Sequence, residues 1–393
     1  MFARIAITGA GIISAIGVGK DETLRSLIAR KSGIGRLRHL QTAHSDLPCG
    51  EVNMSDEELK SLLGIPADRL IPRTTLLGII AVKEAMEQAG IKGADRIALI
   101  SGTTVGGMDV TERHYLQGGD QSLFRLHDCG SCTDEIADFF GGFGLVTTIS
   151  TACSSAANSI MLGAELIKSG RCDVVVAGGA ECLTRYHLNG FNSLKILDSE
   201  PCRPFDATRN GLNLGEGAGF VVLESEGHAL TRGVRPLGVL SGYGNACDAF
   251  HQTASSDDGE GAFLAMSKAL NMSGLIPSDI DYVNAHGTAT PNNDASESRA
   301  MIRLFGSDVP PVSSTKAFTG HTTSAAGSIE AVICLLAIRH GFIPANLNWK
   351  EPFDGGVVPD AEGHQGVRLD HVLCNSFGFG GNDSSLLISR YDK

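Results

Sequence analysis

Short apolar runs alternate with longer amphipathic segments along most of the chain. Apolar runs of strand length, bounded by glycine or charged residues, predict buried strands. These runs cover residues 96–103, 172–181, 217–225, 236–244, 279–288 and 372–381. Helical periodicity predicts helices over residues 76–90 and 261–275, the first with Gly90 as its C-cap. Strands that alternate with helices indicate an α/β fold with buried sheets.

The N-terminal segment "RIAITGAGIIS" is predicted to be a strand that runs into a glycine turn. It does not match a dinucleotide site, because the later glycine spacing and an acidic residue in context are absent. No signal peptide precedes it, and no apolar run is long enough for a membrane helix. We therefore expect a cytoplasmic protein with no membrane span.

Two predicted helix starts share nearly the same letters, "SAANSI" at residues 155–160 and "SAAGSI" at residues 324–329. Six small residues can match by chance. Their equivalent positions at loop-to-helix junctions nevertheless favour a duplicated unit. No long linker separates the halves, so we expect one compact body made of residues 1–230 and residues 231–393.

Composition narrows the function classes. The 393 residues carry a formal net charge of -12, which argues against a general nucleic-acid binder. An acidic partner would need a local basic patch. The ten cysteines have no disulfide-framework spacing, and we interpret them as reduced thiols. Cys129 and Cys132 form a CxxC pair without a second pair, so ordinary thiols are favoured over a zinc or redox site.

Cys153 is the candidate nucleophile. It lies in "STACSSAANSI", where small residues precede a predicted helix. Taken alone, such a cysteine is more often buried and inert. At a helix N-terminus, however, unpaired N–H groups and the helix dipole stabilise a thiolate, and the same N–H groups can hold an oxyanion.

Two histidines lie in similar loop settings and are candidate partners for this cysteine. His286 follows a buried strand in "NAHGTATPNND", and His321 precedes a helix in "TGHTTSAAGSI". A lone histidine at a strand end is usually structural. Two at loop tips, each flanked by glycine and threonine, indicate chemistry.

With these residues together, the chain resembles the β-ketoacyl-acyl-carrier-protein synthases of the I/II type. The motifs are "STACSS" with Cys153, "NAHGTAT" with His286, "SSTK" with Lys316, "TGH" with His321, and "NSFGFGGND". The resemblance implies a thiolase-like α/β fold, a five-layered αβαβα sandwich from two duplicated halves, usually as a homodimer. It also implies a decarboxylative Claisen condensation. Cys153 accepts an acyl group from acyl-carrier protein, malonyl-carrier protein loses CO2, and a β-ketoacyl-carrier protein two carbons longer forms.

The resemblance further implies the roles of the catalytic residues. His286 and His321 would stabilise the enolate that decarboxylation leaves. Lys316, in a network with Glu330, would hold His321, although a plain salt bridge is the alternative for this lysine. The oxyanion hole would consist of the backbone N–H groups of Cys153 and Phe377.

Other residues are implied in substrate binding. Thr288 and Thr290 would bind the pantetheine arm of the carrier, and Asp294 would support their loop. Val105 aligns with the position that controls acyl depth. Phe377 and Phe379, in a glycine-rich loop, resemble the gate over the acyl pocket. No metal and no other cofactor is expected.

Docking of the acidic carrier protein needs positive charge around the entrance. The candidate docking residues are Arg69, Arg73, Lys195 and Arg209. Residues 105–147 depart from the family pattern. This departure suggests, as an alternative to fatty-acid elongation, a specialised synthase of a polyene, pigment or polyketide pathway. Such a synthase could form a heterodimer with a chain-length-factor-like partner.

Three other classes of protein explain fewer of these sequence features. A thiolase would use a second cysteine late in the chain, and Cys374 lies near that region without the "CxG" of thiolases. A non-catalytic chain-length partner lacks the active cysteine, whereas Cys153 is present. A papain-like hydrolase would not explain two histidine loops, "SSTK" and a repeated fold.

Overall fold

A computed structural model describes residues 4–91, 96–115, 118 and 121–392. Within these residues, eleven strands form one mixed sheet in the order β4-β3-β5-β6-β1-β7-β13-β12-β8-β9, and β2 pairs with β1. These strands are β1 (Ile5–Ser14), β2 (Gly17–Val18), β3 (Ile97–Gly102), β4 (Leu145–Ile149), β5 (Val174–Glu181), β6 (Gly217–Ser225), β7 (Gly238–Cys247), β8 (Tyr282–Asn284), β9 (Val312–Ser313), β12 (His371–Gly378) and β13 (Asn382–Ser389). A separate pair consists of β10 (Phe342–Ile343) and β11 (His364–Gln365).

The strand order repeats between the two halves of the chain. Read inward from one edge of the sheet, the N-terminal half has the strand order β4-β3-β5-β6-β1. Read inward from the other edge, the C-terminal half has the matching order β9-β8-β12-β13-β7. The halves meet where β1 pairs antiparallel with β7. The pairing directions repeat as well. β3 is parallel to β4 and β5, as β8 is to β9 and β12. This is the duplication that the repeated letters predicted.

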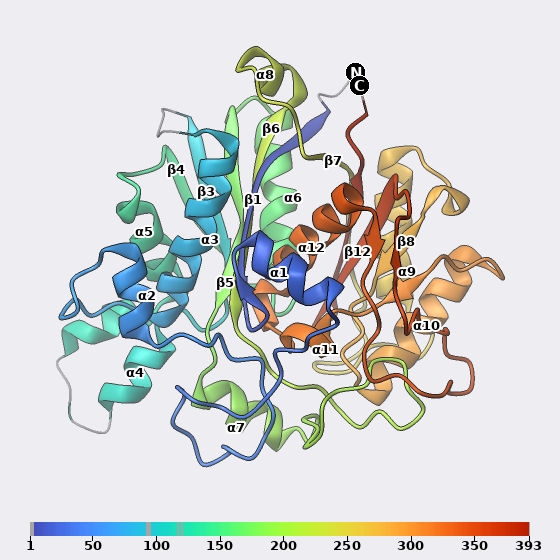
Figure 1. The fold of residues 1–393 in the computed structure, drawn as a ribbon, viewed down its shortest axis with the longest axis horizontal. Coiled ribbons are helices and arrows are strands. Elements are labelled where there is room, and N and C mark those ends of the chain that lie inside the picture. The colour runs from blue at the N-terminus through green and yellow to red at the C-terminus, as the bar shows by residue number, and fades with distance from the viewer. Residues whose placement is uncertain (1–3, 92–95, 116–117, 119–120, 393) are drawn as a thin grey trace.

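Helices cover the sheet on its outer faces and fill the space between its two halves (Figure 1). They are α1 (Lys20–Ile28), α2 (Asp56–Leu63), α3 (Arg73–Ala89), α4 (Met108–His114), α5 (Cys129–Phe139), α6 (Ser155–Lys168), α7 (Arg185–Ser193), α8 (Glu226–Thr231), α9 (Glu260–Ser273), α10 (Pro291–Phe305), α11 (Lys316–Thr319) and α12 (Ala326–His340), with 3-10 turns η2 (Gln121–Leu126), η3 (Pro277–Asp279) and η4 (Thr323–Ala325).

These elements stack in five layers. α3 packs outside β1, β5 and β6, while α9 packs outside β7 and β13 and contacts α10. Between the half-sheets, α6 and α12 pack against each other. α12 is buried from Ala326 to Ile338, because it is apolar on all sides. The predicted thiolase-like αβαβα architecture is therefore present.

Predicted strands and helices are found with their ends moved by a few residues. The strand over residues 217–225 coincides with β6, and the helix over residues 76–90 starts earlier, at Arg73, and ends before Gly90, which has φ of 64°.

The glycine turn predicted near the N-terminus is wrong, because β1 continues through it. A side chain at Gly9 or Gly11 would overlap the carbonyl oxygens of Ala85 and Ala81, so these glycines serve the close packing of α3 on β1.

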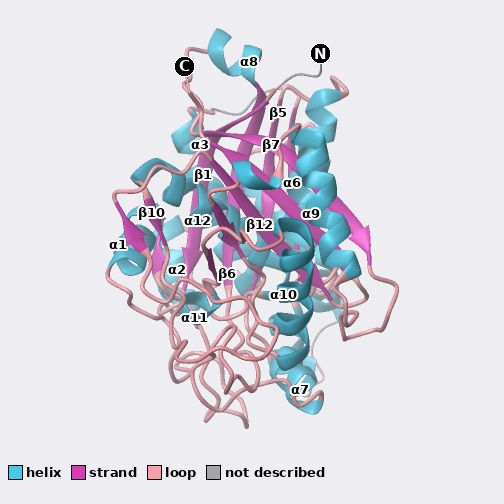
Figure 2. Ribbon diagram, turned by 90° about the vertical axis from the view of Figure 1, so that its right-hand side faces the viewer, coloured by secondary structure: helices cyan, strands magenta, loops and turns pink. Residues whose placement is uncertain are grey.

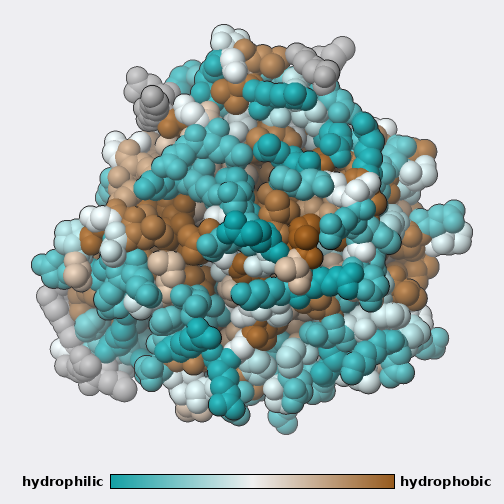
Figure 3. All heavy atoms as spheres, viewed as in Figure 1, coloured by the Kyte–Doolittle hydropathy of each residue, from teal (hydrophilic) through white to brown (hydrophobic). Residues whose placement is uncertain are grey.

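Long loops gather at one end of the molecule, around α7 and α11 (Figure 2). On the face shown in Figure 3, hydrophilic side chains predominate and apolar ones form smaller areas between them. No helix among the described residues is long and apolar enough to cross a membrane.

Candidate active site

Four segments far apart in the sequence meet around one cavity of about 330 Å³. They are the β4–α6 junction, the loop between β8 and α10, the segment between α11 and η4, and the turn between β12 and β13. Of the predicted site residues, the cavity is lined by Cys153, His286, Thr288, Thr290, His321, Phe377 and Phe379. The fold thus brings the candidate nucleophile, both histidines and the glycine-rich turn together.

Cys153 lies on a strained turn just before α6. Ala152 has φ of 52°, a left-handed conformation that residues with a β-carbon rarely adopt, and Thr151 and Cys153 form an isolated bridge. Burial raises the pKa of the Cys153 thiol to about 11 and outweighs the opposing effects of Lys316 and of the backbone amides of Phe379 and Cys153. The thiolate expected from the helix terminus is therefore not the resting form, because the sulfur is buried.

His321 supplies the missing base. Its Nε2 lies 3.1 Å from the sulfur of Cys153. Burial lowers the pKa of His321 well below its ordinary value, and the charges of Lys316 and His187 lower it further. His321 is therefore neutral and can accept the thiol proton.

His286 faces the same cavity beside His321. The two rings lie 5.3 Å apart and nearly perpendicular. The pKa of His286 is also lowered well below its ordinary value, by burial and then by Lys316 and His321. Glu297 fixes the loop, since its carboxylate accepts hydrogen bonds at 2.8 Å from the backbone N–H groups of both His286 and Gly287.

Lys316 and Glu330 form a buried ion pair with 2.6 Å between Nζ and Oε1. The lysine contributes positive charge to the site, where it lowers the pKa of Cys153 and of both histidines. No direct hydrogen bond joins Lys316 to His321 in the described part of the chain, so its effect there is electrostatic.

Besides the predicted Phe377, Phe379 is a candidate for the second amide of the oxyanion hole. The backbone N–H groups of Phe379 and Cys153 lower the pKa of the Cys153 thiol, against the larger effect of burial. Phe377 still lies inside β12, in register with Asp383 of β13, whereas Phe379 lies in the turn after that strand. Phe377 instead places its ring 5.7 Å from that of His286.

Thr288 and Thr290 line the cavity, and Asp294 contacts the loop that carries them. The hydroxyls of Thr288 and Thr290 are 2.9 Å apart at the cavity wall. Asp294 accepts a hydrogen bond from the backbone N–H of Ala289, which has φ of 68°, and so supports the loop between the two threonines.

The acyl-pocket residues are arranged differently from the prediction. Phe379 stacks on Phe191 of α7, with ring centroids 5.7 Å apart, and both line the cavity. Val105 does not line it. Its N–H donates to Oε2 of the buried Glu181 at 3.3 Å, and Oε1 of this glutamate lies 3.7 Å from Nε2 of His187.

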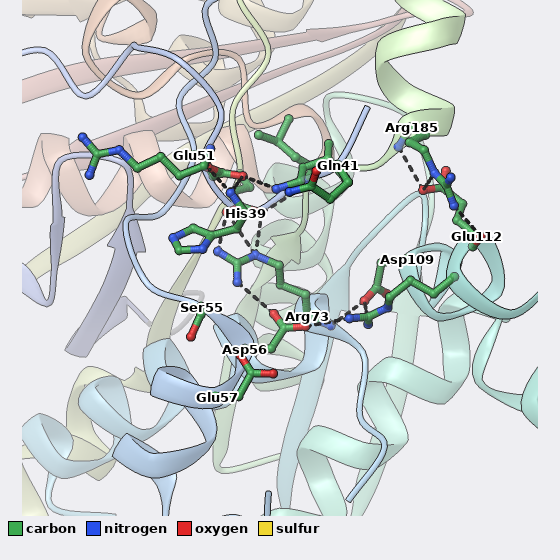
Figure 4. Close-up of a pocket in the computed structure, with 15 residues that line it drawn as sticks. His39, Gln41, Glu51, Ser55, Asp56, Glu57, Arg73, Asp109, Glu112 and Arg185 are labelled. Carbon is green, nitrogen blue, oxygen red and sulfur yellow. Dashed lines mark hydrogen bonds and ion pairs between the residues drawn. The ribbon is translucent and has the colours of Figure 1, made fainter. Parts of the chain in front are cut away.

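Two of the four predicted docking residues are unsuited to docking. Arg73 is buried and pairs with Glu216 at 2.7 Å and Asp56 at 2.9 Å, inside a second cavity of about 590 Å³ (Figure 4). Arg209 donates to the backbone carbonyl of Pro291, and its guanidinium stacks on the Phe353 ring at 3.6 Å.

The other two, Arg69 and Lys195, are exposed. The unusual segment adds an exposed arginine, Arg125 in η2, which acts together with Arg69 to lower the pKa of Glu135 against the effect of burial. The same segment holds Cys129 and Cys132 on α5, with Cys132 buried. Its residues 116–117 and 119–120 lie outside the described residues.

Glu297, Glu181 and Phe191 contribute to the site and were not predicted. Glu297 is on α10, eleven residues after His286 and about one helical turn after Asp294. This spacing places the two acidic side chains on the same side of the helix, and it is the one signal that could have indicated Glu297. Glu181 and Phe191 reach the site only through tertiary packing.

Comparison with known proteins gives a consistent result. Residues 3–229 match the family described as Beta-ketoacyl synthase, N-terminal domain, and residues 237–350 match Beta-ketoacyl synthase, C-terminal domain. The chain is 34% identical to 3-oxoacyl-[acyl-carrier-protein] synthase 2 of Vibrio cholerae and 35% identical to Nodulation protein E of Rhizobium meliloti, each over 98% of this chain and 99% of the relative.

Among solved structures, the ishigamide ketosynthase/chain length factor is similar with a TM-score of 0.91 and 31% identity, over the full length of both chains. The family match, the full-length identity and the cavity that joins Cys153 to His286 and His321 agree. The chain belongs to the beta-ketoacyl synthase family.

Proposed function

We propose that this protein is a β-ketoacyl-acyl-carrier-protein synthase that condenses a Cys153-bound acyl group with malonyl-acyl-carrier protein. The observation that carries the proposal is the placement of the thiol of Cys153 against His321, with His286 facing the same cavity. These are the groups that acyl transfer and enolate stabilisation need.

Acyl transfer comes first. His321 takes the proton from Cys153, and the sulfur attacks the thioester carbonyl of the acyl carrier. The N–H groups of Cys153 and Phe379 lie at the sulfur, where they stabilise the oxyanion of the tetrahedral intermediate. When this intermediate collapses, the carrier thiol leaves with the proton, and Cys153 holds the acyl group as a thioester.

Condensation follows. Malonyl-carrier protein loses CO2, and N–H groups of His286 and His321 stabilise the charge on the enolate oxygen. For this step, neutral His321 takes the tautomer with its proton on Nε2, the nitrogen that faces the cavity. The enolate carbon attacks the Cys153 thioester, the new C–C bond forms, and the bond from the carbonyl carbon to the Cys153 sulfur breaks. The thiolate that leaves then takes a proton from solvent through His321. Lys316 and Glu330 keep positive charge fixed beside both histidines throughout. These steps use only this chain's groups and carrier-bound substrates, so we propose that no further cofactor takes part.

The substrates and partner follow from the same proposal. Thr288 and Thr290 stand at the cavity wall where the pantetheine arm of acyl-carrier protein would enter. β4 is an edge strand whose residues are exposed or half-buried, which supports pairing with a second copy as a homodimer. The reduced cysteines fit a cytoplasmic location.

Fatty-acid elongation is the first candidate pathway, and the name of the Vibrio relative supports it. The similarity to a ketosynthase/chain length factor favours a second candidate, a specialised synthase with a related partner at β4.

One incubation tests the function, with acyl-carrier protein, malonyl-carrier protein and the purified enzyme. We expect CO2 release and a carrier-bound β-ketoacyl product two carbons longer, both abolished in Cys153→Ala. Mass spectrometry of the product over a panel of acyl lengths then separates the two pathways. Condensation that survives in Cys153→Ala, or hydrolysis of the thioester without a new C–C bond, would contradict the proposal.

A further inference from the structure

Asn382 is the centre of a hydrogen-bond cluster next to the catalytic turn. Its side-chain carbonyl oxygen accepts from Oγ of Ser154 at 2.7 Å, Nδ2 of Asn158 at 2.8 Å and Nδ2 of Asn245 at 2.8 Å. Ser154 directly follows Cys153, Asn158 is on α6 and Asn245 is on β7. Asn382 therefore connects the nucleophile helix to two strands of the other half of the sheet.

Asn382 also closes the turn that carries the oxyanion amide. Gly378 of β12 pairs with Asn382 of β13, so only Phe379 and two glycines form the connection. Gly380 and Gly381 have φ of 83° and 76°. Glycines bring conformational freedom and no side chain to hold the turn in place. Asn382 is the first residue after the turn whose side chain anchors it.

The nucleophile and the turn that carries the amide thus share one anchor. Phe379 and Cys153 line the same cavity, and Ser154, beside that cysteine, donates to Asn382. On the same side, the backbone at Gly378 is so close to the Thr151 carbonyl and the Ser154 hydroxyl that an added β-carbon would lie 3.0 Å and 3.3 Å from them. A small displacement of the turn would move the amide relative to the sulfur.

We propose that Asn382 is a positioning residue for acyl transfer, whose side-chain carbonyl fixes the Phe379 amide relative to the Cys153 sulfur. This inference rests on the proposed function. The inference predicts that loss of Asn382 slows acyl transfer and spares decarboxylation, because the enolate is held by His286 and His321. Those histidines come from the β8–α10 loop and the α11–η4 segment, which none of the three hydrogen bonds to the Asn382 oxygen touches.

Three variants test it. Asn382→Leu keeps the approximate size and removes the acceptor, and Asn382→Asp keeps an acceptor for the three donors. Ser384→Ala is the matched control, since Ser384 hydrogen-bonds Asn158 and Asn245 in the same cluster but is not among the donors to Asn382. Intact-protein mass spectrometry measures the rate of Cys153 acylation from an acyl carrier. CO2 release from malonyl-carrier protein measures decarboxylation.

In Asn382→Leu we expect acylation to slow about tenfold, less than complete loss of an oxyanion donor costs, with decarboxylation within about twofold of wild type. Asn382→Asp should recover most of the acylation rate, and Ser384→Ala should match wild type in both assays.

Equal losses in both half-reactions, unchanged acylation in Asn382→Leu, or no recovery in Asn382→Asp would overturn the inference. A wild-type enzyme that neither acylates Cys153 nor decarboxylates malonyl-carrier protein would instead overturn the proposed function.

Discussion

Cys153 is held as a thiol against a neutral imidazole, and this arrangement decides how it reacts. Burial favours the uncharged form of both partners, so the resting pair carries no charge. The proton moves to His321 only as the sulfur attacks.

Removing the base should therefore change the pH dependence of Cys153 alkylation. With His321→Ala, thiolate forms only by ionisation to solvent. Since the pKa of the Cys153 thiol is raised to about 11, the fraction of Cys153 present as thiolate rises with pH up to about pH 11. We expect iodoacetamide to alkylate Cys153 at least about tenfold more slowly near pH 7, with the difference shrinking at higher pH.

Peptide mapping by mass spectrometry gives both alkylation rates in one sample. The exposed Cys247 is the internal control and should react alike in both proteins. Identical pH profiles for Cys153 would show that His321 is not its base.

We expect His286 to act in the second half-reaction alone. The sequence pattern predicts the same defect for loss of either histidine, but only His321 touches the sulfur. His286→Ala should slow malonyl decarboxylation about a hundredfold, as loss of one donor to a developing oxyanion does, and leave Cys153 acylation nearly unchanged. His286→Gln, which keeps an N–H donor, should recover part of the decarboxylation rate. CO2 release measures decarboxylation, and the mass of the intact protein measures Cys153 acylation. If His286→Ala slowed acylation as much as decarboxylation, His286 would act in both half-reactions.

Motifs predict the residues that carry the chemistry, and contacts decide the rest. Cys153, His286 and His321 were evident because each stands in a loop next to an apolar element. The sequence alone does not distinguish Phe377 from Phe379 as the oxyanion amide, because the choice depends on where β12 ends. Arg73 was misassigned to the surface, because its buried partners Glu216 and Asp56 come from distant segments.

At the scale of elements, strands were predicted better than the connections between them. Buried apolar runs such as β5 and β6 have only one stable place in an α/β fold. The glycines of β1 looked like a turn because nothing in the sequence shows that α3 packs directly on them. Residues 105–147 form α4, η2, α5 and β4, and no pattern in this segment predicted them.

The turn between β3 and α4 gives a test of the acyl site. Val105 is buried, and its N–H is tied to Glu181, which also accepts from Thr103 at 2.6 Å and Thr323 at 3.1 Å. This carboxylate joins the turn to the segment just after His321. Val105 does not line the cavity, but Glu181 links its turn to Thr323, so the added volume of Val105→Phe should press on the segment after His321. We therefore expect this variant to exclude long acyl primers while short ones still react.

The measurement for Val105→Phe is the acyl-length profile of carrier-bound products, with Val105→Ile as the control for a modest increase in volume. An unchanged profile in a folded Val105→Phe enzyme would mean that the acyl chain takes another path. A loss of all primers together with a lower melting temperature would point to overpacking instead.

On the scale of the whole molecule, net charge sets a condition for function. The chain has a formal charge of -12, and a carrier protein of the same sign would be repelled unless positive charge surrounds the point of contact. Of the predicted docking residues, burial removes Arg73 and packing occupies Arg209. Arg69 and Lys195 remain exposed, and Arg125 is exposed as well. Burial raises the pKa of Glu135, and both Arg69 and Arg125 oppose this rise. We therefore expect the carrier to meet these two arginines.

Charge reversal at these two arginines should affect encounter and leave the chemistry unchanged. We expect Arg69→Glu to raise the KM for carrier-bound substrate about tenfold at low salt and to weaken its salt dependence, with a further effect from Arg125→Glu. Turnover of a small free thioester should be unaffected, since no residue of the cavity changes. Arg235→Glu is the matched control, because it makes the same charge change at an exposed position between α8 and β7. Arg232 in that segment contacts Ala89 at the C-terminal end of α3, whereas Arg69 precedes the N-terminal end of the same helix. Steady-state kinetics at several salt concentrations measure these effects. If Arg235→Glu raises KM as much as Arg69→Glu, net charge alone governs the encounter, and if both substrates slow equally, the substitution has disturbed the fold.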